Sequence, residues 1–399
     1  MTSSTPRPLG QGHIPALDGI RGLAIFMVMA VHFIAVFEPI TVFQRGLHNA
    51  SGYGTLGIDL FFILSGFLIT GILQDSKAHR RYFRNFFIRR LLRIFPLYYG
   101  VLLSIYGGIA IASRFGFAAD PKLMEAQPWA WSYLLNLFIA REGAWTVPYI
   151  GHFWSLAVEE QFYMVWPFVV YFLSPKRLIV VSGILVVFAT LCHLILDAHG
   201  VSFVTVHVLT PCRLNALCAG AFLASWLRLP ATQLGGASLV KRRAWQLVVA
   251  ATLAKVTIYL LVIFWPSLVN DLEALRALSW IGLFAALHLA AVAVKPESVL
   301  HRLLALRPLL FLGKYSYGIY VFHHFFSWPS LHYHLVTRMA GTLGSLTAAV
   351  LVNATIGMFA SIIVAWLSYH AFEKHFLKFK DILAPSAARA PSASSAPLA

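Results

Sequence analysis

The chain has 399 residues, of which 59% are hydrophobic and only 12% are charged. A typical soluble domain has about 45–50% apolar and about 25% charged residues. So few charges cannot cover a soluble globule with polar surface, and the high hydrophobicity excludes a disordered chain. The cysteines Cys192, Cys212 and Cys218 all lie in apolar runs, so no disulfide framework is expected. These values predict a polytopic membrane protein.

Ten segments are apolar enough to cross a bilayer, since a spanning helix needs about 20 mostly apolar residues. They lie at residues 18–38, 54–74, 88–113, 152–173, 178–198, 205–227, 244–266, 274–294, 308–328 and 344–370. We therefore predict an all-α fold, a polytopic membrane helical bundle with about ten transmembrane helices. The membrane domain is expected to cover residues 1–382, and the Ala-, Pro- and Ser-rich segment 383–399 to form a disordered tail.

The placement of Lys and Arg predicts how these helices are oriented. With a cytoplasmic N-terminus, 22 of the 31 Lys and Arg residues lie on the cytoplasmic side, five lie outside and four lie within the spans. This asymmetry follows the positive-inside rule and places both termini in the cytoplasm. It also accounts for the net charge of +16 in a protein of the lipid bilayer, without a nucleic-acid partner. The external segment 114–151 contains an apolar stretch, 129–140, that is short for a span and is expected to be interfacial or re-entrant.

Two ionisable residues share one face of the first span. Arg21 and His32 are eleven residues apart, which is three helical turns plus about 20°. The rise between them is roughly 16 Å, so Arg21 lies at the cytoplasmic surface when His32 lies near mid-membrane. Intramembrane ionisable residues are costly and indicate function. The alternative is a packed, hydrogen-bonded histidine and an ordinary flanking arginine.

The second span carries a carboxylate among glycines, in the stretch GIDLFFILSGFLIT. The glycines favour close helix packing. Asp59 is expensive at this depth unless it is protonated or has a partner such as His32 or Arg213.

The entry to the third span reads RNFFIRRLLRIFPLYY and is strongly basic. Arg90 and Arg93 have i, i+3 spacing and therefore share a helix face. Arginine binds phosphate through two parallel hydrogen bonds, which predicts a site for a phosphate-bearing ligand that enters from the cytoplasm. A basic face that contacts solvent or lipid headgroups is the alternative.

Polar residues recur every four positions in the fourth span. Ser155, Glu159, Tyr163 and Pro167 form a slowly drifting stripe on one helix face. Glu160 lies about 100° further round the helix, which leaves open whether it joins them. A hydroxyl, a carboxylate and a phenol on one buried stripe predict a polar network, either catalytic or structural.

Other polar residues give weaker signals. Arg213 lies inside the sixth span, and His323 and His324 lie near the external end of the ninth. The histidines His332 and His334 have no Cys or carboxylate near them, so no metal site is predicted.

Taken together, five motifs resemble those of the acyltransferase-3 family of bacterial integral membrane O-acyltransferases, over about residues 14–380. The motifs are Arg-x10-His (Arg21, His32), the glycine-rich stretch around Asp59, Arg-x2-Arg (Arg90, Arg93), Ser-x3-Glu-x3-Tyr-x3-Pro (Ser155, Glu159, Tyr163, Pro167) and SYxxYxxH (Ser316, Tyr317, Tyr320, His323). Two features depart from the family pattern. His375 stands where a proline is expected, and the hydrolase-like domain of some members is not present in this sequence. Acceptor binding is therefore expected to use the membrane domain and its external loops.

The resemblance implies an enzyme that transfers an acetyl or other short acyl group from cytoplasmic acyl-CoA to a hydroxyl of an extracytoplasmic carbohydrate. The acceptor would be a glycan or glycolipid of the O-antigen, exopolysaccharide or peptidoglycan type, and the enzyme would lie in the bacterial cytoplasmic membrane. Acyl-CoA would be a co-substrate, with no tightly bound cofactor. The acceptor and the oligomeric state are not predicted.

The resemblance also implies roles for individual residues. Arg21, Arg90 and Arg93 would bind the CoA phosphates. His32 would be the general base or would carry the acyl group as an acyl-imidazole. The remaining candidates would orient the imidazole or the acceptor, and they are Asp59, Ser155, Glu159 and Tyr163.

Three alternatives remain open. The enzyme would acylate a secondary metabolite such as a macrolide, the chain would be a proton-coupled transporter, which uses intramembrane Asp, Glu, His and Arg equally well, or it would be a structural or scaffold membrane protein. A His-x4-Asp pair, His13 and Asp18, resembles the motif of glycerolipid acyltransferases but lies in a short tail without their globular domain.

Overall fold

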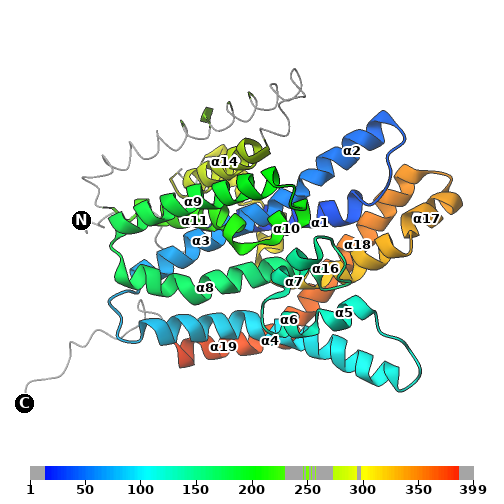
Figure 1. The fold of residues 1–399 in the computed structure, drawn as a ribbon, viewed down its shortest axis with the longest axis horizontal. Coiled ribbons are helices and arrows are strands. Elements are labelled where there is room, and N and C mark those ends of the chain that lie inside the picture. The colour runs from blue at the N-terminus through cyan, green and yellow to red at the C-terminus, as the bar shows by residue number, and fades with distance from the viewer. Residues whose placement is uncertain are drawn as a thin grey trace, which may run out of the picture.

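A computed structural model describes residues 14–229, 273–293 and 298–385, together with a few isolated positions between 246 and 257. Every element in these ranges is helical, as predicted (Figure 1). The first half contains α1 (Pro15–Ile34), α2 (Val42–Gly52), η1 (Tyr53–Leu56), α3 (Gly57–Asp75), α4 (Tyr82–Ser113), α5 (Pro121–Glu125), α6 (Gln127–Trp131), α7 (Leu135–Glu142), η2 (Gly151–Phe153), α8 (Trp154–Phe172) and α9 (Pro175–Ala198). The second half contains α10 (Phe203–Val208), α11 (Thr210–Trp226), α14 (Glu273–Ala293), α15 (Val299–Leu304), α16 (Arg307–His332), α17 (Leu335–Leu343), α18 (Leu346–Ser368), the π-helix η4 (Tyr369–Glu373) and α19 (Lys374–Leu383).

Five helical segments in the described part are long and apolar enough to cross a membrane. They are Pro15–Ile34, Val42–Asp75, Tyr82–Ser113, Pro175–Ala198 and Leu346–Lys380. Helices α8, α11, α14 and α16 occupy four more of the predicted spans. The span predicted at 244–266 lies outside the described ranges, so the total of ten stays a prediction. The segment 383–399 is described only as far as Pro385, so the predicted disorder also stays untested.

Helix α1 runs parallel to α16. Gly313 packs against the backbone of Asp18, and at the other end of the pair the rings of His32 and His323 have centroids 4.9 Å apart. Because the N-terminal parts of both helices are in contact, and so are their later parts, the two helices run in the same direction. The first and the ninth predicted spans must also run in the same direction, since successive spans alternate.

Helix α3 runs parallel to α11, and glycines bring the two helices into backbone contact. The start of α3 meets the start of α11 where Asp59 pairs with Arg213. A Cβ on Gly66 would collide with the carbonyl of Leu217, and one on Gly220 with the carbonyl of Ile63. Small residues allow this approach, and close packing stabilises helix pairs where lipid replaces water. Figure 1 shows α3, α9 and α11 side by side, with α8 next to them.

The short helices α5 to α7 cap one end of the bundle. They have five, five and eight residues, which is too short to cross a membrane. Buried tyrosines of α4 hold α5 and α6 in place, because the hydroxyl of Tyr98 donates to the carbonyl of Ala130 (2.7 Å) and that of Tyr106 to the carbonyl of Leu123 (3.1 Å).

The two ends of the described chain lie at the opposite end of the bundle. Helix α19 packs along α4, and Arg89 donates a hydrogen bond of 2.6 Å to the carbonyl of Ala384. Arg21, near the start of α1, lines a cavity with Arg93 of α4. Both ends are therefore on one side, while the assignment of that side to the cytoplasm stays a prediction from charge.

Reporter fusions test the orientation. Fusions after Arg242 and Lys378 should report a cytoplasmic position, and fusions near Asp120 and Thr342 an external one, because of the asymmetry of Lys and Arg. Paired fusions of alkaline phosphatase and green fluorescent protein measure this. An external reporter after Lys378 would contradict the predicted topology.

Candidate active site

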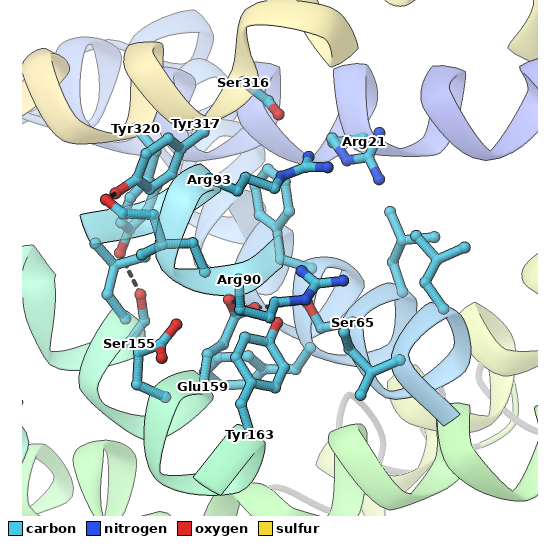
Figure 2. Close-up of a pocket in the computed structure, with 18 of the residues that line it drawn as sticks. Arg21, Ser65, Arg90, Arg93, Ser155, Glu159, Tyr163, Ser316, Tyr317 and Tyr320 are labelled. Carbon is cyan, nitrogen blue, oxygen red and sulfur yellow. Dashed lines mark hydrogen bonds between the residues drawn. The ribbon is translucent and has the colours of Figure 1, made fainter. Parts of the chain in front are cut away.

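A central cavity of about 170 Å³ lies between helices α1, α3, α4, α8 and α16. Its polar lining brings together residues that are far apart in the sequence (Figure 2). It includes six of the eight predicted site residues, namely Arg21, Arg90, Arg93, Ser155, Glu159 and Tyr163. The other two, His32 and Asp59, do not line it.

Three guanidinium groups lie together in this cavity, as Figure 2 shows. Arg21 donates a hydrogen bond to Asp18 one turn earlier in α1. Arg90 lies over the ring of Tyr163, at 5.3 Å from its centroid. Arg93 makes no hydrogen bond or ion pair with any residue that the structure describes. The cavity therefore presents more positive charge than its own carboxylates neutralise at this end, which suits an anionic ligand.

Glu159 is held at both carboxylate oxygens. The hydroxyl of Ser65 on α3 donates to Oε1 (2.8 Å), and the hydroxyl of Tyr163 donates to Oε2 (3.2 Å). The i, i+4 spacing of Glu159 and Tyr163 makes the second contact possible.

Glu160 lines the same cavity, which answers the question that its position on the helix left open. The side chain is only 5% exposed, and its Oε1 has no hydrogen-bond partner among the described residues. Sequence reasoning gave Glu160 no role, because the four-residue stripe assigned only its neighbour to the site.

The far end of the cavity is closed by Ser155 and Tyr320. The hydroxyl of Tyr320 donates to the carbonyl of His152 (2.7 Å), and the hydroxyl of Ser155 then donates to the oxygen of Tyr320. Ser155 comes from α8 and Tyr320 from α16, so this pair joins two of the predicted motifs.

Behind this pair lies a cluster of four imidazoles, from His32, His152, His323 and His324. The centroid of His32 is 4.9 Å from that of His323 and 5.3 Å from that of His324, and His152 is 4.8 Å from each of the same two rings. The described residues contain no group of three or more His, Cys, Asp or Glu arranged to hold a metal ion. The rings of His152 and His323 place titratable nitrogen atoms next to Tyr320.

A backbone carbonyl fixes the tautomer of His32. Nδ1 lies 2.8 Å from the carbonyl of Val28, one turn earlier in α1. A carbonyl only accepts, so Nδ1 carries the proton and Nε2 of the neutral ring has a free lone pair. An imidazole in this state is competent as a general base or as a nucleophile.

Sequence reasoning missed His152. Its Nε2 donates to the carbonyl of Val321 (3.3 Å), and its Nδ1 is buried with no hydrogen-bond partner among the described residues. Nε2 of His323 is also buried with no hydrogen-bond partner among the described residues. His152 lies three residues before Ser155, one turn away on the same face, and this spacing was the available signal.

Asp59 lies in a separate polar cluster. Its Oδ1 accepts from Nη1 of Arg213 (3.2 Å), which is one of the partners that the sequence suggested. Arg213 also donates to the carbonyl of His207 (2.7 Å) and lies 5.6 Å from the ring centroid of Trp154. Asp59 is thus not brought together with Glu159, and its catalytic role stays a prediction. In the His-x4-Asp pair, Asp18 binds Arg21, and His13 lies outside the described residues.

With this geometry in view, comparison with known proteins identifies the class. A family model described as an acyltransferase domain matches residues 14–370, so the chain belongs to the acyltransferase-3 family. The motifs thus indicated the family correctly, and the described helices include five that are long and apolar enough to cross a membrane. No solved structure matches it significantly.

The curated relatives are longer proteins. YrhL of Bacillus subtilis is 29% identical over 91% of this chain and 54% of its own length. The peptidoglycan O-acetyltransferase OatA of Listeria monocytogenes is 27% identical over 92% of this chain and 58% of its own length. The O-acetyltransferase OatA of Staphylococcus aureus is 27% identical over 78% of this chain and 50% of its own length. The chain thus spans about half the length of the curated relatives it matches.

The Asp59–Arg213 pair can be tested by removing one partner and then both. Arg213→Met should lower the free energy of unfolding by about 3–5 kcal/mol, because the carboxylate is left buried and unpaired. Adding Asp59→Leu should recover most of that loss. Unfolding of the purified proteins in detergent measures both effects.

Two results would contradict this interpretation. Equal destabilisation of the single and the double variant would show that the pair does not hold α3 against α11. Wild-type acyl transfer by a folded double variant would remove Asp59 from the catalytic candidates.

Proposed function

We propose that the protein transfers an acetyl or other short acyl group from acyl-CoA to a hydroxyl of an extracytoplasmic glycan. The observation that carries this proposal is the lining of the central cavity. It connects the guanidinium groups of Arg21, Arg90 and Arg93 with the Ser155–Tyr320 pair, and the imidazoles lie behind that pair. An elongated ligand with phosphates at one end and a reactive group at the other suits this arrangement.

The arginines support an acyl-CoA donor because they offer charge and geometry together. A guanidinium donates two parallel hydrogen bonds to a phosphate, and such bonds are stronger than neutral ones. Arg93 makes no hydrogen bond or ion pair in the described part of the chain, so its donors are free for a ligand phosphate.

His32 supports the chemistry through its free Nε2. Acting as a base, it would take the proton of the acceptor hydroxyl while the oxygen attacks the thioester carbonyl. The carbon–sulfur bond then breaks, and the thiolate takes up that proton. Acting as a nucleophile, Nε2 would attack the thioester carbon, and the carbon–sulfur bond would break to give an acyl-imidazolium and a thiolate. The acceptor hydroxyl would then attack the acyl group, its proton would pass to the thiolate, and the neutral imidazole would be restored. The tautomer of His32, with its proton on Nδ1, suits either route.

The relatives support a carbohydrate acceptor. OatA of Listeria monocytogenes is named as a peptidoglycan O-acetyltransferase. We extend a glycan acceptor to this chain on that similarity, with the bacterial cytoplasmic membrane as its location. Acylation of a secondary metabolite remains the alternative acceptor chemistry.

Donor affinity should depend on the arginines of α4. Arg90→Lys and Arg93→Lys keep the charge but lose the planar fork, so each should weaken binding of acetyl-CoA. Loss of one charge-assisted contact costs about 1.5–3 kcal/mol, which is roughly ten- to a hundredfold in affinity. Isothermal titration of the purified protein measures this. Unchanged affinity in both Arg→Ala variants would assign these residues to ordinary positive-inside charge.

The chemical step should depend on His32. His32→Ala should keep its fold and its donor affinity but lose at least the 10²–10⁴-fold in rate that a general base typically supplies. Arg21→Ala should weaken donor binding as well as rate. Release of CoA from acetyl-CoA in the presence of soluble peptidoglycan fragments measures the rate. Wild-type turnover by His32→Ala would overturn the mechanism, and transport without CoA binding would favour the transporter.

A further inference from the structure

A second cavity lies beside the central one, between α4, the first turns of α16 and the segment from α18 to α19. Its volume is about 390 Å³, compared with about 170 Å³ for the central cavity. The π-helix η4 (Tyr369–Glu373) forms part of its wall. A π-helical turn is wider than an α-helical one and occurs frequently at functional sites.

The lining of this cavity is strongly basic. Four cationic residues face one carboxylate, that of Glu373, and the four are Arg89, Arg93, Lys314 and Lys380. Lys314 has no carboxylate within ion-pair distance in the described part of the chain. Lys314 therefore adds a positive charge to this cavity that no carboxylate of the described residues pairs with, and it suits a ligand with a phosphate.

Two tyrosine rings lie next to the unpaired lysine. The rings of Tyr315 and Tyr369 are nearly perpendicular (87°), with centroids 5.2 Å apart. Nζ of Lys314 lies 5.0 Å and 5.4 Å from the two centroids. Aromatic rings beside a cation offer stacking to a nucleobase and a charge to its phosphate.

The two cavities share a wall made of side chains. Arg93 and Tyr317 line both of them. The hydroxyl of Tyr317 donates to the carbonyl of Ile94 on α4 (2.7 Å), which fixes the position of this wall. A ligand whose phosphate group lies at Arg93 can thus extend into both cavities. The central cavity leads toward Ser155, and the basic cavity leads toward Lys314.

We propose that the basic cavity binds the 3′-phosphorylated adenosine end of an acyl-CoA donor, with Lys314 on the 3′-phosphate and Tyr369 against the adenine. This inference rests on the proposed acyl-CoA donor. The phosphate of an anionic lipid headgroup shares the charge requirement. The adenosine is favoured because it also uses the tyrosine rings and because the cavity adjoins the one that would hold the thioester.

The test compares CoA with 3′-dephospho-CoA, so that it needs no acceptor. Wild-type protein in neutral phosphatidylcholine nanodiscs should bind CoA about tenfold more tightly than 3′-dephospho-CoA. Lys314→Gln should lose this difference by weakening CoA binding alone, because only CoA carries the 3′-phosphate. Lys378→Gln on α19 is the matched control, since Lys378 is exposed and lines neither cavity. Tyr369→Leu should weaken both ligands equally.

The outcomes separate this inference from the proposed donor. Tight CoA binding by wild type together with an unchanged preference in Lys314→Gln would overturn the inference and leave the donor in place. Failure of wild type to bind CoA at all would overturn both. Stabilisation by added phosphatidylglycerol that Lys314→Gln removes, with CoA affinity unchanged, would assign the cavity to a lipid headgroup and overturn the inference.

Discussion

The structure depends on how each charge inside the bundle is compensated, because an isolated charge in a low-dielectric interior is very unfavourable. Asp59 and Arg213 solve this by pairing directly, at 3.2 Å, and so join α3 to α11. Arg93 has no such partner in the described part of the chain and faces cavities instead. The compensated pair thus joins two helices, whereas Arg93 lies on the wall between two cavities.

Part of the fold can be predicted from patterns of apolar and polar residues in the sequence. Long apolar runs predicted the five helical segments that are long and apolar enough to cross a membrane, because hydrocarbon thickness sets the length that such a helix needs. The four-residue spacing placed Ser155 and Glu159 on one wall, and the structure brings both to the central cavity. Helical periodicity is local, so residues on a single helix face were within reach of this reasoning.

Contacts between different helices could not be predicted from the sequence in this way. Sequence reasoning named Arg213 as one of several partners for Asp59, but nothing in the chain chose between them. His152 was missed because its neighbours come from α1 and α16, and Glu160 because a wide cavity admits residues from more than one face of α8. The basic cavity combines Arg93 and Tyr317, which belong to two different motifs, with Lys314 and Tyr369, which belong to none, so no single local pattern predicted it.

The glycine contacts limit which substitutions these helices tolerate. A Cβ on Gly313 would collide with the backbone carbonyl of Asp18, and one on Gly66 with that of Leu217. A Cβ on Gly54 would likewise collide with the carbonyl of Met27, where α1 approaches the segment before α3. Adding a single methyl group at any of these positions therefore requires two helix backbones to move apart. The spacing of the helices around the central cavity thus depends on the absence of one carbon atom at each contact.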